Sequence, residues 1–293
     1  MMKTFIGFNQ GQYGDLFINL TACRVLKKMH PDCNLIFSIN QRYKDVIEIF
    51  KLSKDIDGFM VWEKEDNWPS ALDIQNLLEE VPEIQKLLEE FPEGEFGLFH
   101  PMAIHPIEDW YNYWHQTEET CVAHGLPRPT EEDMDFKLNK PEIKKENTIT
   151  ICPSRRIDNE GNHQNSKALT IEQIELVKQF GIKNNLKVIQ ISGPQEEQIE
   201  GLEKFEGNYS ESVIKVLQSR FLVSSDTGMI WAASAFSHPV VGLYDLSYYK
   251  DAVSCENWTP KNKNQQTIEA QSMGDIKEEV LEKYLEEVYT KSK

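Results

Sequence analysis

The sequence has no long apolar run. No stretch approaches the roughly 20 consecutive apolar residues that a membrane-spanning helix needs. Near its start there is also no basic segment followed by an apolar run, the pattern of a secretory signal. We therefore expect a cytoplasmic protein with at most peripheral membrane contact.

Cysteine and histidine are too sparse and scattered to predict a disulfide framework or a metal site. The cysteines are odd in number and show no close pairing. His100 and His105 stand five residues apart beside prolines, a spacing that does not place them on one helical face. We therefore expect neither a metal nor another resident cofactor. The five cysteines are Cys23, Cys33, Cys121, Cys152 and Cys255.

Basic residues are also few. The chain has 31 lysines and arginines against 48 aspartates and glutamates, a formal net charge of -17. Segment 63–135 alone holds 19 acidic side chains and three basic ones. Such a field repels phosphate backbones, so we expect no nucleic-acid partner. A merely solvated acidic surface explains the excess equally well.

What the sequence does have is an alternation of short apolar segments and amphipathic helices, at a length of 293 residues that suits two cores. This alternation predicts an α/β protein with parallel sheets. In the N-terminal half we expect strands at 3–8, 34–39 and 58–62, and helices at 15–29 and 42–50.

The alternation resumes after a segment rich in proline and charge, 125–147, which is typical of an interdomain connection. We therefore predict domains 1–145 and 146–293. The second is expected to have strands at 148–152, 187–192, 221–224 and 239–244, and helices at 170–183, 210–218, 227–236 and 275–289. The last helix carries an apolar stripe, and we expect it to pack across the domain junction.

Two loops join a predicted strand to a predicted helix and carry residues suited to ligand chemistry. In the first, Gly14 permits close approach of a ligand, and Asp15 is either the N-cap of the helix or a functional carboxylate. In the second, Asp226, Thr227 and Gly228 open a helix whose backbone N–H groups suit an anion, although a simple helix cap is the alternative.

Four segments resemble glycosyltransferase family 9, the family of ADP-heptose heptosyltransferases. They are NQGQYGDL at 9–16, ICPSRR at 151–156, IQISGPQEE at 189–197 and DTGMIWAASAFSHPVVGLY at 226–244. The resemblance extends from residue 3 to about residue 246. It implies the GT-B fold, in which two Rossmann-like domains face a cleft, an N-terminal one for the acceptor and a C-terminal one for a nucleotide-sugar donor.

The resemblance also implies roles for individual residues. Asp15 matches the aspartate that serves as general base, a role that suits a carboxylate beside an acceptor hydroxyl. Lys167 occupies the place of a lysine on the donor phosphates, and Glu196, chosen over Glu197, that of a glutamate on the ribose. The implied donor-binding residues are Gly14, Ser154, Arg155, Arg156, Lys167, Gly193, Glu196, Asp226, Thr227 and Gly228.

One position departs from the family pattern, because Trp231 stands where the family usually has a histidine. An indole cannot exchange a proton as an imidazole does. Beside the first hypothesis, an inverting and metal-independent glycosyltransferase, this leaves a non-catalytic protein that binds sugar nucleotides or glycans. A nucleotide-sugar epimerase is a third alternative. Because acidic residues crowd the N-terminal half, we expect a glycan or glycolipid acceptor that is neutral or bears an amine.

Overall fold

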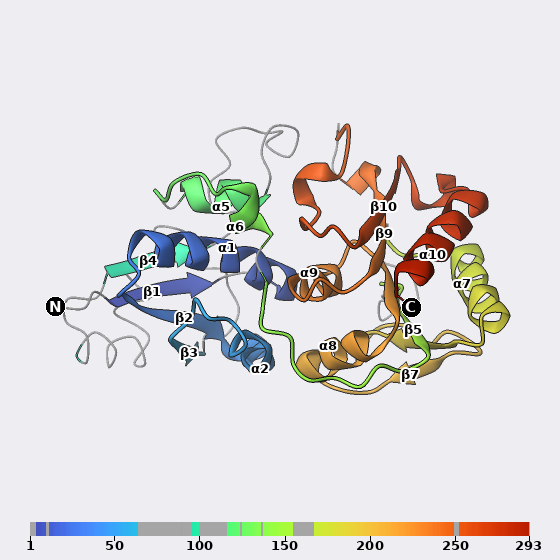
Figure 1. Cartoon of the computed structure of the whole chain (residues 1–293), viewed down its shortest axis with the longest axis horizontal. Helices are drawn as coiled ribbons and strands as arrows, with labels where there is room; N and C mark the ends of the chain where they lie inside the picture. The colour runs from blue at the N-terminus through green and yellow to red at the C-terminus, as the bar shows by residue number, and fades with distance from the viewer. Residues whose placement is uncertain are drawn as a thin grey trace. The chain divides into compact units, whose positions relative to one another are not determined.

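The computed structural model describes residues 4–9, 12–63, 89, 95–99, 116–123, 125–135, 137–154, 167–248 and 252–292. The chain divides into two compact units, Met1–Asn139 and Lys140–Lys293 (Figure 1). The division falls within the segment rich in proline and charge, a few residues before the predicted boundary near residue 145.

The N-terminal unit contains a sheet of four parallel strands in the order β3-β2-β1-β4. The predicted strands and the first helix are confirmed, while β4 and the helices after it were missed. The elements are β1 (Thr4–Asn9), α1 (Tyr13–Met29), β2 (Asn34–Asn40), the 3-10 helix η1 (Gln41–Val46), α2 (Ile47–Phe50), β3 (Gly58–Trp62), β4 (Glu95–Phe99), α5 (Gln116–Ala123) and α6 (Glu131–Met134).

Three phenylalanines join the first elements of this unit. The ring of Phe50 from α2 lies edge-on to Phe17 from α1, with centroids 4.9 Å apart, and to Phe37 from β2, at 5.2 Å. All three are fully buried. Such aromatic pairs add to the stabilisation from burial alone, so this cluster fixes α1 and the segment after β2 against the sheet.

The C-terminal unit contains six parallel strands in the order β10-β9-β8-β5-β6-β7. The strands and helices predicted here are confirmed, apart from small shifts at their ends. The elements are β5 (Thr148–Cys152), α7 (Ile171–Lys183), β6 (Lys187–Ile191), β7 (Glu203–Phe205), α8 (Tyr209–Gln218), β8 (Phe221–Ser225), α9 (Gly228–Ala235), β9 (Val240–Asp245), β10 (Gln265–Ala270), α10 (Glu278–Ser292) and the 3-10 turns η4 (Leu246–Tyr248), η5 (Glu256–Trp258) and η6 (Met273–Asp275).

Capping residues explain where two of these helices begin. Thr170 caps α7 and Asn208 caps α8, and in both a side chain three residues on bonds back to the backbone N–H of the cap. This reciprocal arrangement pairs N–H groups that would otherwise lack an acceptor. The helices therefore start where the sequence places these caps.

Helix α10 packs in the core of its own unit. Its buried stripe of Leu281, Leu285 and Val288 joins the cluster that includes Val177 and Phe180 from α7. The helix also contacts β9 and β10 (Figure 1). The sequence predicts instead that this stripe packs across the domain junction. The stripe packs within its own unit because α7 and the β9–β10 side of the sheet present apolar residues to it.

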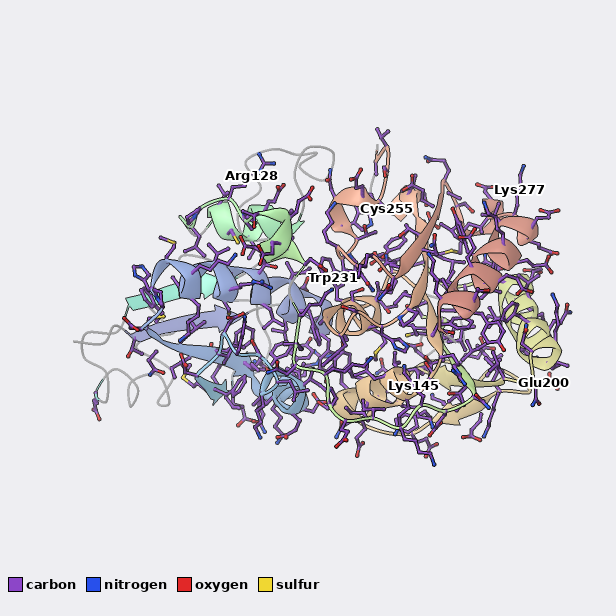
Figure 2. The ribbon with its side chains drawn as sticks, in the orientation of Figure 1. Arg128, Lys145, Glu200, Trp231, Cys255 and Lys277 are labelled. Atoms are coloured by element: carbon purple, nitrogen blue, oxygen red, sulfur yellow. The ribbon has the colours of Figure 1, made fainter. Side chains whose placement is uncertain are left out.

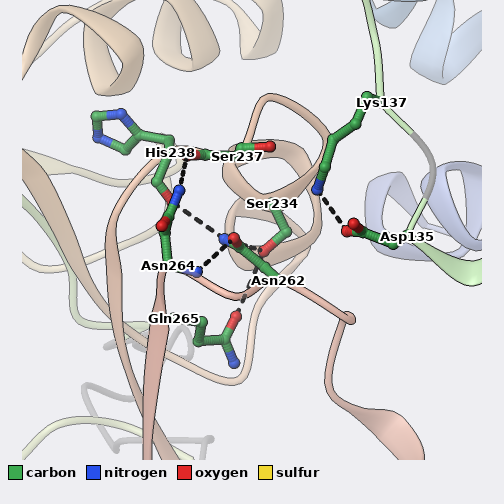
Figure 3. A network of polar contacts seen from close by, with 8 residues as sticks. All are labelled: Asp135, Lys137, Ser234, Ser237, His238, Asn262, Asn264 and Gln265. Carbon is green, nitrogen blue, oxygen red and sulfur yellow. Dashed lines mark hydrogen bonds and ion pairs between the residues drawn. The ribbon is translucent and has the colours of Figure 1, made fainter. Parts of the chain in front are cut away.

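The turn between α9 and β9 is held by two asparagine side chains. Ser237 has a left-handed backbone, with φ of 51°. Asn264 donates to the carbonyl of Ser237 at 2.8 Å, and Asn262 donates to that of His238 at 3.0 Å (Figure 3). These bonds satisfy backbone groups of a turn that has little regular structure of its own, so they fix the end of α9.

His238 itself is completely buried, between Lys145 and Ser219. Its Nε2 lies 3.3 Å from Ser219 Oγ, and its Nδ1 lies 3.4 Å from Lys145 Nζ. Although Lys145 is exposed overall, its ammonium also donates to the carbonyls of Leu217 and Ser219 at 2.8 Å. Burial, followed by the charge of Lys145, holds the pKa of His238 well below its usual value.

We therefore expect acid to destabilise the protein through His238. The folded chain keeps this imidazole neutral, whereas the unfolded chain protonates it below about pH 6.5, so the free energy of unfolding should fall by up to about 1.4 kcal/mol per pH unit from there downwards. Thermal unfolding at pH 7.5, 6 and 5 measures this. His238→Gln should flatten the acid side of the profile, and an unchanged acid side in that variant would contradict the assignment.

Candidate donor and acceptor sites

The carboxyl edge of the C-terminal sheet gathers most of the predicted donor-binding residues. Strand β5 lies between β6 and β8, with Cys152 beside Ser224 and Ile151 beside Gln190. The segments that follow these three strands therefore leave the sheet at one edge, where ligands of open parallel sheets bind. They carry Ser154, Gly193, Glu196, Asp226, Thr227 and Gly228.

Lys167 and Asp226, 59 residues apart in sequence, form an ion pair at this edge. Lys167 Nζ lies 2.6 Å from Asp226 Oδ2, and the two side chains are only 15% and 14% exposed. The family resemblance implies that both residues bind the donor. The structure shows that the lysine is already balanced by a carboxylate, which accepts hydrogen bonds and repels phosphate. Lys167 is thus the cation of this pair and Asp226 its anion.

The N-terminus of α9 lacks the usual cap. Thr227 occupies the N-cap position, but its side chain makes no capping hydrogen bond. Its hydroxyl instead lies 3.0 Å from Ser224 Oγ and 3.8 Å from Cys152 Sγ. Tyr209 donates to the carbonyl of Gly228 at 3.0 Å, which holds the first turn in place. Thr227 therefore does not accept a hydrogen bond from the first backbone N–H groups of α9. A helix N-terminus that binds an anion uses such N–H groups as donors.

The loop after β6 is held by a lysine that the sequence did not single out. Lys204 Nζ donates to the carbonyls of Gly193 and Glu196, each at 3.1 Å. The carboxylate of Glu196 affects the thiol of Cys152: burial first, and then the charge of Glu196, raises the pKa of Cys152 to about 12. Glu196 is therefore near the ends of both β5 and β6.

Ser154 has a left-handed backbone, with φ of 55°, and is buried. Residues other than glycine adopt this conformation at a cost and often do so at functional sites. Two residues earlier the chain leaves β5, so the unusual conformation lies directly at the sheet edge. Arg155 and Arg156 lie outside the described residues, as do His100 and His105.

Trp231 lies in the second turn of α9 and is only 4% exposed (Figure 2). The whole run from Met229 to Ala235 is buried, so this helix has no solvated face. The indole therefore serves packing at the position where the resemblance would place an imidazole.

In the N-terminal unit, Asp15 lies in the first turn of α1 and not at its cap. Gln12 is the N-cap residue, Gly14 is the second helical residue, and Asp15 is the third. Asp15 Oδ2 accepts the backbone N–H of Gln12 at 2.8 Å, within a capping box. The side chain is half-buried. The N-cap interpretation of Asp15 is therefore wrong, because Asp15 supports the helix start from the third helical position. Its side chain still meets solvent at the carboxyl edge of β1.

Across the ranges that the structure describes, no three histidine, cysteine, aspartate or glutamate side chains are placed to hold a metal ion. In those same ranges no helix is both long and apolar enough to cross a membrane. The five cysteines are buried and free.

The fold is that of the GT-B glycosyltransferases. The chain matches the glycosyltransferase family 9 structure from Veillonella parvula over 99% of this chain and 97% of that one, with 14% identity and a TM-score of 0.70. It matches E. coli ADP-heptose LPS heptosyltransferase II over 99% of both chains, with 15% identity and a TM-score of 0.63.

A third match is E. coli heptosyltransferase WaaC with ADP, over 98% of this chain and 100% of that one, with 13% identity and a TM-score of 0.59. No family model and no curated protein sequence matches the chain. At such low identity the likeness shows the fold, and function has to be argued from the site.

Proposed function

We propose that this protein is an inverting glycosyltransferase that moves a sugar from a nucleoside diphosphate donor, of the ADP-heptose kind, to a hydroxyl group of a glycan or glycolipid. The observation that carries the proposal is the arrangement at the carboxyl edge of the C-terminal sheet. There a lysine, an α-helix N-terminus without a side-chain cap and a glutamate lie on one GT-B domain.

Each of these groups has a part in holding the donor. The helix N-terminus and Lys167 meet the diphosphate, whose negative charge grows as the bond to the sugar breaks. Arg155 and Arg156, which follow β5 in the sequence, add positive charge. Glu196 accepts hydrogen bonds from the ribose. These contacts supply the charge stabilisation that a metal ion would otherwise provide.

Asp15 is the proposed general base. Its carboxylate takes the proton of the acceptor hydroxyl while the hydroxyl oxygen attacks the anomeric carbon of the donor sugar. The new carbon–oxygen bond forms as the bond to the diphosphate oxygen breaks, and the nucleoside diphosphate leaves. Attack opposite the leaving group inverts the configuration at the anomeric carbon.

The donor site can be tested by calorimetric titration of the native chain with ADP, GDP and UDP. We expect micromolar binding of one of them, weakened about tenfold by Lys167→Ala, because that cation is already shared with Asp226. Lys178→Ala is the matched control, since Lys178 pairs with Glu175 on the surface of α7. No binding of any nucleotide, or equal loss in the control, would count against the donor site.

A second candidate function is binding of a sugar nucleotide without turnover, which the buried Trp231 favours. An indole packed into the core cannot donate or accept the proton that an imidazole would. Release of a free nucleoside diphosphate from its sugar donor in the presence of an acceptor distinguishes the two functions, because a binding protein releases none.

A further inference from the structure

A second group of side chains lies, like Asp15, at the carboxyl edge of the N-terminal sheet. Strands β1 and β2 are parallel neighbours, with Phe8 opposite Ser38. Their carboxyl ends therefore lead into α1 and η1 side by side. Tyr13 is the first residue of α1, and η1 brings Arg42, Tyr43 and Asp45.

These four residues contact one another, and we name them the β1–β2 corner. Tyr13 donates its hydroxyl hydrogen to Asp45 Oδ1 at 2.7 Å. The rings of Tyr13 and Tyr43 meet edge to face, with centroids 5.0 Å apart at 80°. The guanidinium carbon of Arg42 lies 5.8 Å from the centre of the Tyr43 ring. The corner thus presents two aromatic rings, a carboxylate and a guanidinium group in one place.

The fold of η1 does not require this arrangement. Asn40 already caps η1, because its Oδ1 accepts the N–H of Arg42 at 2.9 Å. Val46 and Ile49 anchor the segment in the core and are buried. Tyr13, Tyr43 and Asp45 are by contrast only half-buried, and Arg42 is exposed. Their side chains therefore remain accessible to a ligand.

The protonation of the corner suits a ligand that carries hydroxyl groups. Burial, and then the hydrogen bond to Asp45, raises the pKa of Tyr13 far above its usual value. The phenol therefore stays neutral and keeps donating to Asp45. A sugar ring offers apolar C–H faces to aromatic side chains, hydroxyl donors to a carboxylate and hydroxyl oxygens to a guanidinium group.

We propose that the β1–β2 corner binds a neutral pyranose ring of the acceptor and brings a hydroxyl group of the acceptor to Asp15. The proposal rests on the proposed function and names the part of the site that selects the acceptor. Within the corner the positive charge of Arg42 is matched by the negative charge of Asp45, so the corner offers no net attraction to a strongly charged sugar. Tyr43 provides the aromatic surface, and Asp45 orients the ring through its hydroxyl groups.

Saturation-transfer NMR on the full chain tests this with methyl β-glucoside, methyl β-glucosaminide and glucose 6-phosphate as probes. We expect the two methyl glycosides to bind at millimolar concentration, and glucose 6-phosphate to bind no better. Tyr43→Ala and Asp45→Asn should each weaken methyl β-glucoside binding at least about fivefold. Lys44→Ala, an exposed neighbour in η1, should leave it unchanged.

Several results would overturn the proposal: no signal from either methyl glycoside, equal binding by all variants, or a clear preference for glucose 6-phosphate, which would make Arg42 an anion contact. Calorimetry with ADP, GDP and UDP on the same samples separates this proposal from the proposed function. Nucleotide binding without sugar binding refutes only the sugar site proposed at the β1–β2 corner. Sugar binding without any nucleotide binding refutes only the proposed donor site.

Discussion

Asp15→Asn should lower the rate of sugar transfer by about 100- to 10,000-fold, because an amide cannot take the proton of the acceptor hydroxyl. The side chain keeps its shape, and its amide oxygen can still accept the N–H of Gln12. Nucleotide affinity should therefore stay unchanged. The measurement is the release of ADP from ADP-heptose, or from the donor that matches whichever nucleotide binds, with an acceptor present.

A control separates the base from the helix cap. Glu211 holds the same third position in α8 and accepts the N–H of Asn208 at 2.8 Å. Glu211→Gln repeats the loss of charge in a capping box of the C-terminal unit and should leave the rate of transfer intact. If Asp15→Asn retains a third or more of the native rate, another group must act as the base.

Asp226→Asn should tighten the binding of the nucleoside diphosphate by about 10- to 100-fold. The change removes a negative charge from the place proposed for the diphosphate, and it frees Lys167 from a partner at 2.6 Å. Because both side chains are mostly buried, water screens this pair less than it screens pairs at the surface. Calorimetry with the nucleotide that binds the native chain measures the change.

The gain should depend on the lysine. In Lys167→Ala, adding Asp226→Asn removes only the repulsion by the carboxylate, so the improvement should be smaller than in the native chain. Weaker binding by Asp226→Asn alone would mean instead that the carboxylate positions Lys167 or bonds to the donor directly. This cycle therefore reports whether Asp226 opposes the donor or supports it.

Much of the fold follows from local patterns in the sequence. Buried strands such as β5 and β8 are continuous apolar or small-residue runs, and helices such as α7 start at a recognisable cap. Strand β7 has only three residues, and β10 is mostly polar with a single buried side chain, so neither stands out from a loop. Their place in the sheet comes from pairing with β6 and β9, which local sequence does not specify.

The candidate sites could be predicted in part. Gly14 and Asp15 lie in the first turn of α1, and Asp226, Thr227 and Gly228 stand at the start of α9, so the sequence located both strand-to-helix turns. The ion pair between Lys167 and Asp226 joins residues from two separate loops, and only the sheet order β8-β5-β6 brings those loops together. Lys204 and Tyr209 donate hydrogen bonds to backbone carbonyls. Every residue has such a carbonyl, so the sequence does not indicate which one a side chain will contact.

Helix α10 returns to α7 and to the β9–β10 side of its own sheet. The C-terminal half is therefore a self-contained module: one uninterrupted stretch of chain supplies its sheet, its covering helices and the residues proposed to hold the donor. Such a module can be exchanged as a block, and the residues proposed to hold the donor can change independently of the half that carries Asp15.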